Sequence, residues 1–197
     1  MDVFEAMNTA RAMRFYKTDP VPQELLDKVL WAATRASSPN NTQAWHFVVV
    51  RDPEQRRRLG EVVAPLAARV KDFPDPGNEV DRRTLKGAAN LSASLGTVPV
   101  IIVVCGRNVY PAHQPQETMM YSAMYAASQN LVVAARAVGL GAAFTTLHHL
   151  GERQMRDILG IPDEVYIGTV IPLGYPDGPT GPVSRRPVDE VVHYDRW

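Results

Sequence analysis

The stretch ATRASSPNNTQAWHFVVV (residues 33–50) holds the end of one element, a connection and the start of another. Its first residues continue a segment with apolar residues at helical spacing, and the residues from Trp45 onward are aromatic and β-branched, which favours a buried strand. Between them stand seven small or polar residues, Ser37 to Gln43, although a turn needs only about two or three. The connection is therefore either an ordinary surface loop or a rim of hydrogen-bonding groups that faces a ligand.

Outward from this stretch, helices and strands follow one another without a strict βαβ alternation. The longest helix, expected at 117–138, has apolar residues at steps of three and four, and Gly139 after it suits a left-handed cap. The pattern predicts an α+β fold with one mixed or antiparallel sheet flanked by helices. The other expected helices lie near 2–9, 22–35, from Asp52-Pro53 onward, 79–96 and 151–159, and the expected strands at 45–51, 98–105, 142–146 and 165–175.

The composition suits one domain over residues 1–197, with 45% hydrophobic and 21% charged residues. Twenty-one basic residues balance 21 acidic ones, which argues against a nucleic acid or an anionic membrane as a partner. No apolar run approaches the roughly 20 residues that span a bilayer. The opening MDVFEAMNTA lacks the basic and apolar regions of a signal peptide, so we expect the protein in the cytoplasm.

The last segment, residues 176–197, differs from the rest of the chain. It is rich in Pro and Gly, so it contributes little core of its own, yet it ends in the partly apolar VDEVVHYDRW. Such a tail drapes over another surface, its own or that of a neighbouring subunit.

Several catalytic templates fail. The chain has no Gly-rich phosphate loop and no G-x-S-x-G elbow. The single cysteine, Cys105, lies in an apolar run and is expected to be a buried hydrophobe. His148 and His149 are read as neighbours on a strand that point to opposite faces, so no metal site is predicted. No side chain stands out as a nucleophile or an acid–base pair.

Arginines carry the clearest chemical signal. Arg11 and Arg14 stand three residues apart after the first predicted helix, and Arg185 and Arg186 stand in the tail. Guanidinium groups bind phosphate through paired hydrogen bonds, and several together form a strong anion site. The alternative is that each is an ordinary solvated arginine.

Four motifs, in order across residues 2–193, resemble the flavin-dependent nitroreductase family. The first resembles that family's opening Arg-Arg-Ser-x-Arg-x-Phe, the second its polar loop and following strand, the third its central helix with a Gly-rich turn, and the fourth its closing Gly-Tyr-Pro and Arg-x-Pro signature. In this sequence they read ARAMRFYKTDPVP, ASSPNNTQAWHFVVV, AASQNLVVAARAVGLGAAFTTL and PLGYP with SRRPVDEVV.

The resemblance implies an intertwined homodimer that binds FMN at its interface, with the tail from about residue 176 draped over the partner. Arg11 and Arg185 would hold the phosphate and Arg14 the N1/O2 edge of the ring. The polar loop would reach the flavin of the other subunit. The remaining implied contacts come from Ala12, Met13, Ser37, Ser38, Pro39, Asn41, Phe144, Thr145, Thr146 and Leu147.

This sequence departs from the family pattern at a few positions, and each departure affects a single implied contact with FMN. Ala12 replaces the usual Ser, so a side-chain hydroxyl on the phosphate is missing and only the backbone N–H remains. Ala36-Ser37-Ser38 replaces Ala-Pro-Ser, and Gln43-Ala44-Trp45 replaces Gln-Pro-Trp. Three arginines still suffice to neutralise a phosphate dianion.

The implied activity is an FMN-dependent oxidoreductase that passes hydride from NADH or NADPH to an electron-poor acceptor by a two-step exchange, with FMN N5 in place of a catalytic residue. Nitroaromatics, quinones and activated alkenes are candidates. The alternatives are another flavin reaction (dehalogenation, ring dehydrogenation or flavin fragmentation), flavin storage without turnover, and an interaction module without flavin. Residues 66–86, with Phe73, and 106–121, with Tyr110 and Tyr121, are lid candidates, although these aromatics suit core or interface equally well.

Overall fold

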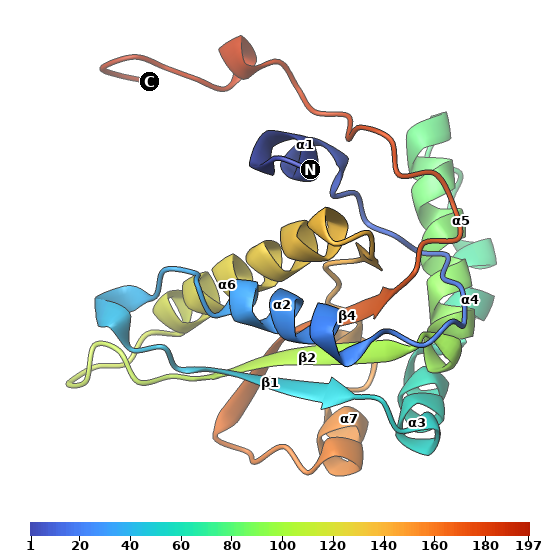
Figure 1. The fold of residues 1–197 in the computed structure, drawn as a ribbon, viewed down its shortest axis with the longest axis horizontal. Helices are drawn as coiled ribbons and strands as arrows, with labels where there is room; N and C mark the ends of the chain where they lie inside the picture. The colour runs from blue at the N-terminus through green and yellow to red at the C-terminus, as the bar shows by residue number, and fades with distance from the viewer.

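The computed structural model describes residues 1–197 and contains one four-stranded sheet (Figure 1). The strands are β1 (Trp45–Val50), β2 (Val100–Arg107), β3 (Gly141–Ala142) and β4 (Val165–Gly174). Their order is β1-β2-β4-β3, and every neighbouring pair is antiparallel. This confirms the α+β fold with an antiparallel sheet. The third strand is shorter than predicted, and only an isolated bridge from Thr145 to Val170 continues it.

Seven helices surround the sheet. Their starts follow local capping rules: the side chains of Asp2, Asp52 and Asn78 accept hydrogen bonds from backbone N–H groups three residues later. One predicted helix is divided in two near Pro65, which stands at the first turn of the second piece. The helices are α1 (Val3–Thr9), α2 (Gln23–Ala33), α3 (Pro53–Val63), α4 (Pro65–Arg69), α5 (Glu79–Ser94), α6 (Glu117–Ala137) and α7 (Glu152–Leu159).

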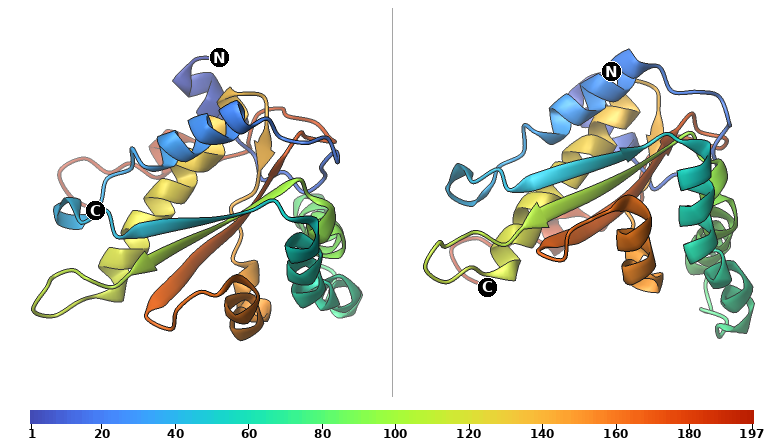
Figure 2. Two further views of the ribbon diagram at one scale, coloured as in Figure 1. Left: turned by 60° about the horizontal axis from the view of Figure 1, so that its bottom comes forward. Right: turned by 90° about the horizontal axis from the view of Figure 1, so that it is seen from below.

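The two faces of the sheet are covered by different helices (Figure 2). Side chains of β2 alternate between the faces: Ile102 and Val104 pack with α2 and α6, whereas Ile101 and Val103 pack with α3, α5 and α7. Because both faces are covered, β2 is buried from Val100 to Gly106, which explains its unbroken apolar run. Each such side chain contributes roughly 1.5–3 kcal/mol through burial.

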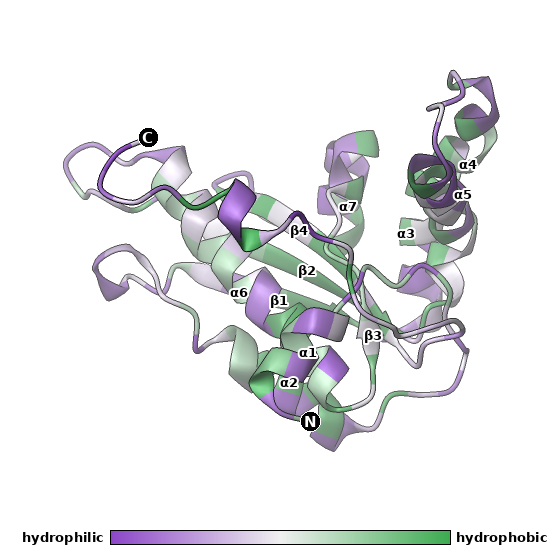
Figure 3. Ribbon diagram, turned by 90° about the horizontal axis from the view of Figure 1, so that it is seen from above, coloured by the Kyte–Doolittle hydropathy of each residue, from purple (hydrophilic) through white to green (hydrophobic).

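The C-terminal segment runs back past the beginning of the chain. The N–H of Asp177 donates to the carbonyl of Phe15 at 2.9 Å, and the N–H of Val183 donates to the carbonyl of Asn8 at 2.8 Å. From Ser184 to the C-terminus every residue is exposed. In Figure 1 this last part extends beyond α1, away from the sheet, and in the view from above it passes in front of the sheet (Figure 3). None of the helices has both the length and the apolar character needed to cross a membrane.

Candidate functional site

The segment from Arg11 to Lys17 is extended and fixed to the end of the sheet. The N–H of Met13 donates to the carbonyl of Ala142 in β3 at 3.0 Å, and the N–H of Lys17 donates to Tyr175, just after β4, at 3.0 Å. The partly buried phenol of Tyr16 donates to the carbonyl of Met13 at 2.7 Å. These bonds hold the backbone between two arginines, Arg11 and Arg14, in a fixed position.

A cavity of about 520 Å³, the arginine cavity, opens between this segment, α5 and the C-terminal segment. Four arginines line it: Arg11 and Arg14 from the extended segment, Arg83 from α5 and Arg185 from the tail. No acidic residue is among the lining residues, so the cavity attracts anions. The other lining residues are Ala12, Met13, Phe15, Val80, Thr84, Gly87, Gly178, Pro179, Pro182, Val183 and Ser184.

Gly87 places Arg14 against α5. A Cβ at position 87 would lie 2.6 Å from Cδ of Arg14, so only glycine lets the arginine stem cross the helix here. The amide of Asn90, one turn later, donates to the carbonyl of Arg14 at 2.7 Å. Burial, together with the nearby charge of Arg11, lowers the pKa of Arg14. An arginine stays protonated despite such a shift, so a half-buried cation lines the cavity.

Five residues predicted as cofactor contacts thus share one cavity, although the first and last are 174 positions apart: Arg11, Ala12, Met13, Arg14 and Arg185. The α5 residues Arg83, Thr84 and Gly87 were not among the predicted contacts. A glycine inside a predicted helix was the available signal for Gly87, because such a glycine often marks a close approach. Of the two lid candidates, only the first contributes to the cavity, through α5, and neither Phe73 nor Tyr110 lines it.

The polar loop lies at the other end of the molecule from α5 (Figure 1). It contains a single 3-10 turn, Pro39–Asn41, and three non-glycine residues with positive φ: Asn40 (49°), Asn41 (52°) and Gln43 (49°). The N–H of Gln43 donates to Oγ of Ser38 at 3.1 Å. The predicted contacts Ser37, Ser38, Pro39 and Asn41 do not line the arginine cavity of their own subunit.

The predicted contacts after β3 form a second separate group. The carbonyl of Thr145 accepts a hydrogen bond from the N–H of Val170 at 3.0 Å, which holds this strand extension on β4. The exposed ring of Phe144 meets the ring of Tyr125 edge-on, with the two ring centroids 5.5 Å apart. The ring centroids of Tyr125 and Tyr121 are 5.6 Å apart. Phe144, Thr145, Thr146 and Leu147 line no part of the arginine cavity.

The prediction that His148 and His149 point to opposite faces of a strand is wrong. They lie in a 3-10 turn, Leu147–Leu150, and their rings are 4.1 Å apart. Donor atoms of both residues and of Glu152 lie within 4.8 Å of one another. Arg156, however, donates to Oε1 of Glu152 at 2.8 and 3.0 Å, so the charge of this carboxylate is already paired with a guanidinium.

His148 is a buried neutral imidazole. Its side chain is 2% exposed, and its Nδ1 has no hydrogen-bond partner. Burial, reinforced by the neighbouring His149, lowers the pKa of His148 to about 4. The residue therefore acts on the pH dependence of stability, because protonating it in place would bury a charge.

Comparison with known proteins agrees with the fold and the motifs. The sequence profile of the Nitroreductase family matches residues 8–175. A putative NADH dehydrogenase/NAD(P)H nitroreductase of Methanothermobacter thermautotrophicus is 34% identical over 202 residues, covering 100% of this chain and 88% of the relative.

Two solved structures share the fold at 21% identity. An oxidised iodotyrosine deiodinase bound to FMN and 3-iodo-L-tyrosine superposes with a TM-score of 0.77, covering 100% of both chains. The NADPH:FMN oxidoreductase of Vibrio harveyi complexed with NAD⁺ superposes with a TM-score of 0.73, covering 99% of this chain and 77% of the other. The profile match, which spans most of the chain, and the relative that is 34% identical settle the family. The chain belongs to the nitroreductase family and is, as a member of it, an NAD(P)H-dependent flavin oxidoreductase.

Proposed function

We propose that this protein holds FMN with its phosphate in the arginine cavity and passes hydride from NAD(P)H to an electron-poor acceptor. The observation that carries the proposal is the lining of that cavity: four arginines from three separate elements, with no acidic residue among them. Like charges gathered in this way repel one another, and an anionic ligand bound between them would offset that repulsion.

The residues fit the phosphate end of FMN. A cavity of about 520 Å³ lies within the usual range of roughly 300–1,000 Å³ for small-molecule sites. Arg11 and Arg185 would hold the phosphate through paired hydrogen bonds. The backbone N–H groups of Ala12 and Arg14 donate to no acceptor within the chain, so they remain able to bind phosphate oxygens. The Ala in place of the family's Ser at position 12 therefore leaves a backbone donor.

When bound, FMN supplies the hydride-accepting and hydride-donating atom, N5 of its ring. The chain contributes position and charge. Arg14, held by Gly87 and Asn90, would place a partly desolvated cation where negative charge develops on reduction, and such a fixed charge stabilises it without reorganisation. The main chain and side chains of Phe144 to Leu147 would line the ring.

The proposed site needs two subunits, because the polar loop and the arginine cavity lie at opposite ends of one chain. An apolar groove of about 720 Å³ runs between α1, α2 and α6, and large side chains on it are exposed: Phe4 at 80% and Trp31 at 64%. A second copy covering this groove would bury them. Twofold symmetry then brings each loop, Ser37 to Asn41, to the partner's flavin and forms two equal sites. The exposed tail would drape over that partner.

We propose a ping-pong order in the cytoplasm, in which the oxidised nicotinamide leaves before the acceptor enters the same face of the ring. For a nitroaromatic the balance of one turn is ArNO₂ + NAD(P)H + H⁺ giving ArNO, NAD(P)⁺ and water. Quinones and activated alkenes accept the same two electrons. The neighbouring rings of Tyr121, Tyr125 and Phe144, the first pair tilted and the second edge-to-face, offer an aromatic surface for such flat acceptors.

An anaerobic absorbance titration of the purified protein tests the proposal. We expect a flavin band that NADPH or NADH bleaches and that a nitroaromatic or quinone then restores. Halide release from a halogenated phenol, without nitro or quinone reduction, would instead indicate reductive dehalogenation. A band that neither nicotinamide bleaches would favour flavin storage. If no band appeared even after FMN was added, the proposal would be wrong.

A further inference from the structure

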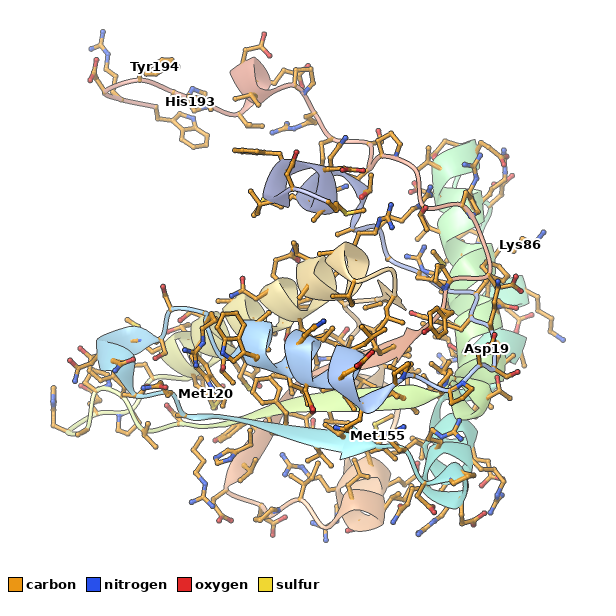
Figure 4. All side chains as sticks on the ribbon, in the orientation of Figure 1. Asp19, Lys86, Met120, Met155, His193 and Tyr194 are labelled. Carbon is orange, nitrogen blue, oxygen red and sulfur yellow. The ribbon has the colours of Figure 1, made fainter.

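Helix α5 carries three basic residues near the arginine cavity, and only one of them lines it. Arg82 forms a two-point ion pair with Asp75 at 2.8 and 3.0 Å. Lys86 extends away from the body of the protein (Figure 4). Arg83 is the α5 cation among the lining residues, so its charge faces the cavity while the charges beside it do not.

The position of Arg83 follows from helical spacing. Val80, Arg83, Thr84 and Gly87 all line the cavity and lie three or four positions apart, on one face of α5. Since the stem of Arg14 crosses at Gly87, Arg83 lies one turn, about 6 Å along the helix axis, beyond Arg14. The nearest carboxylate, that of Glu79, is 3.9 Å away, and both side chains are at least 70% exposed, so this ion pair contributes little.

When the four arginines of the cavity are compared with the negative charges of FMN, Arg83 has no counterpart. A phosphate monoester such as that of FMN carries about two negative charges at neutral pH, which Arg11 and Arg185 match. The negative charge of a reduced ring is matched by Arg14. The fourth guanidinium therefore has no counterpart in the cofactor.

Resting on the proposed function, we propose that Arg83 binds an anionic group, a phosphate or a carboxylate, of the second ligand that enters beside the flavin. One source of that group is the 2′-phosphate of NADPH, which would make Arg83 the residue that selects NADPH over NADH. The other is a carboxylate on an aromatic acceptor. In both cases Arg83 determines specificity and leaves FMN binding unchanged.

Equilibrium binding to the FMN-loaded protein, followed through perturbation of the flavin absorbance spectrum, tests this without turnover. The ligand pairs are NADP⁺ against NAD⁺ and 4-nitrobenzoate against 4-nitrobenzamide, which differ mainly in the anionic group. The wild type should prefer the anionic member of at least one pair. R83Q should reduce that preference about tenfold, as expected for a charge-assisted hydrogen bond, and R83K should recover part of it. The matched control R82Q, one residue away, should change neither preference more than about twofold.

The outcomes separate the two proposals. Loss of the NADP⁺ preference alone identifies the reductant's phosphate, and loss of the nitrobenzoate preference alone identifies the acceptor. If the wild type prefers neither anion, or if R83Q keeps both preferences with FMN bound, the assignment of Arg83 is wrong while the flavin site stands. If R83Q loses FMN itself, Arg83 is a cofactor ligand and the assignment is also wrong. Failure of the wild type to bind FMN overturns the proposed function, and this is seen before any variant is made.

Discussion

The arginine cavity and the polar loop are the two regions that carry the functional signal, and they are built in opposite ways. The cavity is charged, and its walls come from three elements within one chain: the segment after α1, α5 and the tail. The loop, residues 37–43, has no charged residue. Asn40, Asn41 and Gln43 adopt the left-handed region, and the side chain of Ser38 accepts the N–H of Gln43. The loop lies at the other end of the molecule from α5, which forms one wall of the cavity (Figure 1).

This difference indicates which part of the proposed site needs a partner. A phosphate can be bound by one subunit, since all four guanidinium groups belong to the same chain. In the proposed site the flat ring would take hydrogen bonds from a polar loop, and this subunit's own loop does not line its cavity. Changes in the cavity should therefore act on cofactor affinity directly, whereas changes in the loop should act through the neighbouring subunit.

The largest effect on flavin binding is expected from removing a phosphate ligand. Arg11→Ala or Arg185→Ala should weaken FMN binding by roughly 10- to 100-fold, because each removes a charge-assisted hydrogen bond worth about 1.5–3 kcal/mol. Fluorescence titration of apoprotein with FMN measures this. Arg186→Ala is the matched control, since Arg186 neighbours Arg185 in the tail but does not line the cavity. If Arg185→Ala and Arg186→Ala lost FMN affinity equally, lining the cavity would not explain the role of Arg185, and the proposed phosphate site would be contradicted.

The buried imidazole of His148 should make the stability of the fold depend on pH, independently of the arginine cavity and the polar loop. Because the pKa of His148 falls from its ordinary 6.5 to about 4 on folding, the unfolded chain takes up the proton first. Stability should then fall as the pH drops from 6.5 towards 4, by up to about 3 kcal/mol from this residue. Urea unfolding at several pH values should show that His148→Gln loses this dependence and the exposed His149→Gln keeps it. A parallel pH dependence in both variants would contradict the assignment.

A smaller effect tests the contact that places Arg14. Gly87→Ala would put a Cβ 2.6 Å from Cδ of Arg14 and displace the guanidinium, so we expect FMN to bind about tenfold more weakly. The helix itself should not suffer, because Ala exceeds Gly in helix propensity by about 1 kcal/mol. Gly178→Ala lines the same cavity with nothing within 4 Å and should leave binding unchanged. Unchanged affinity in Gly87→Ala would mean that Arg14 does not depend on α5.

The smallest effect concerns the loop backbone. Gln43 has a φ of 49°, a conformation that costs a non-glycine residue about 1 kcal/mol. Gln43→Gly should relieve this cost, so thermal unfolding should show stability unchanged or raised by less than about 1 kcal/mol. Gln43→Pro should destabilise, because it forbids the observed φ and removes the N–H that donates to Ser38. A clear loss of stability in Gln43→Gly would show that its side chain, and not its backbone, holds the loop.

The sequence predicted most of the fold because the strongest patterns are local. The unbroken apolar run of β2 and the spacing of α6 each identify an element with little help from the rest of the chain. The local pattern predicts too long a strand at β3 and misses the 3-10 turn at His148, because pairing with β4 and packing decide where that strand ends. Local patterns did not reveal these tertiary effects.

The candidate site divides in the same way. Arg11, Arg14 and Arg185 could be named from motifs, whereas the wall formed by α5 could not. Gly87 and Arg14 are in contact although they are 73 positions apart in the chain. No local pattern in the sequence predicts a contact between residues so far apart. The positive φ at Gln43 was equally hidden, because glutamine rarely adopts it, whereas asparagine, as at Asn40, adopts it more often.

The most direct test of the central claim, that each flavin is held by one subunit's cavity and the partner's loop, uses mixed dimers. Arg185→Ala disables the cavity, and Ser37→Trp places a bulky ring on the exposed loop. Each variant alone should bind little FMN at both of its sites. Heterodimers isolated with two affinity tags should regain one intact site, and therefore about half the flavin of the wild type per dimer. If heterodimers bound no more FMN than either parent, the two regions would not meet across the interface and the account would be wrong.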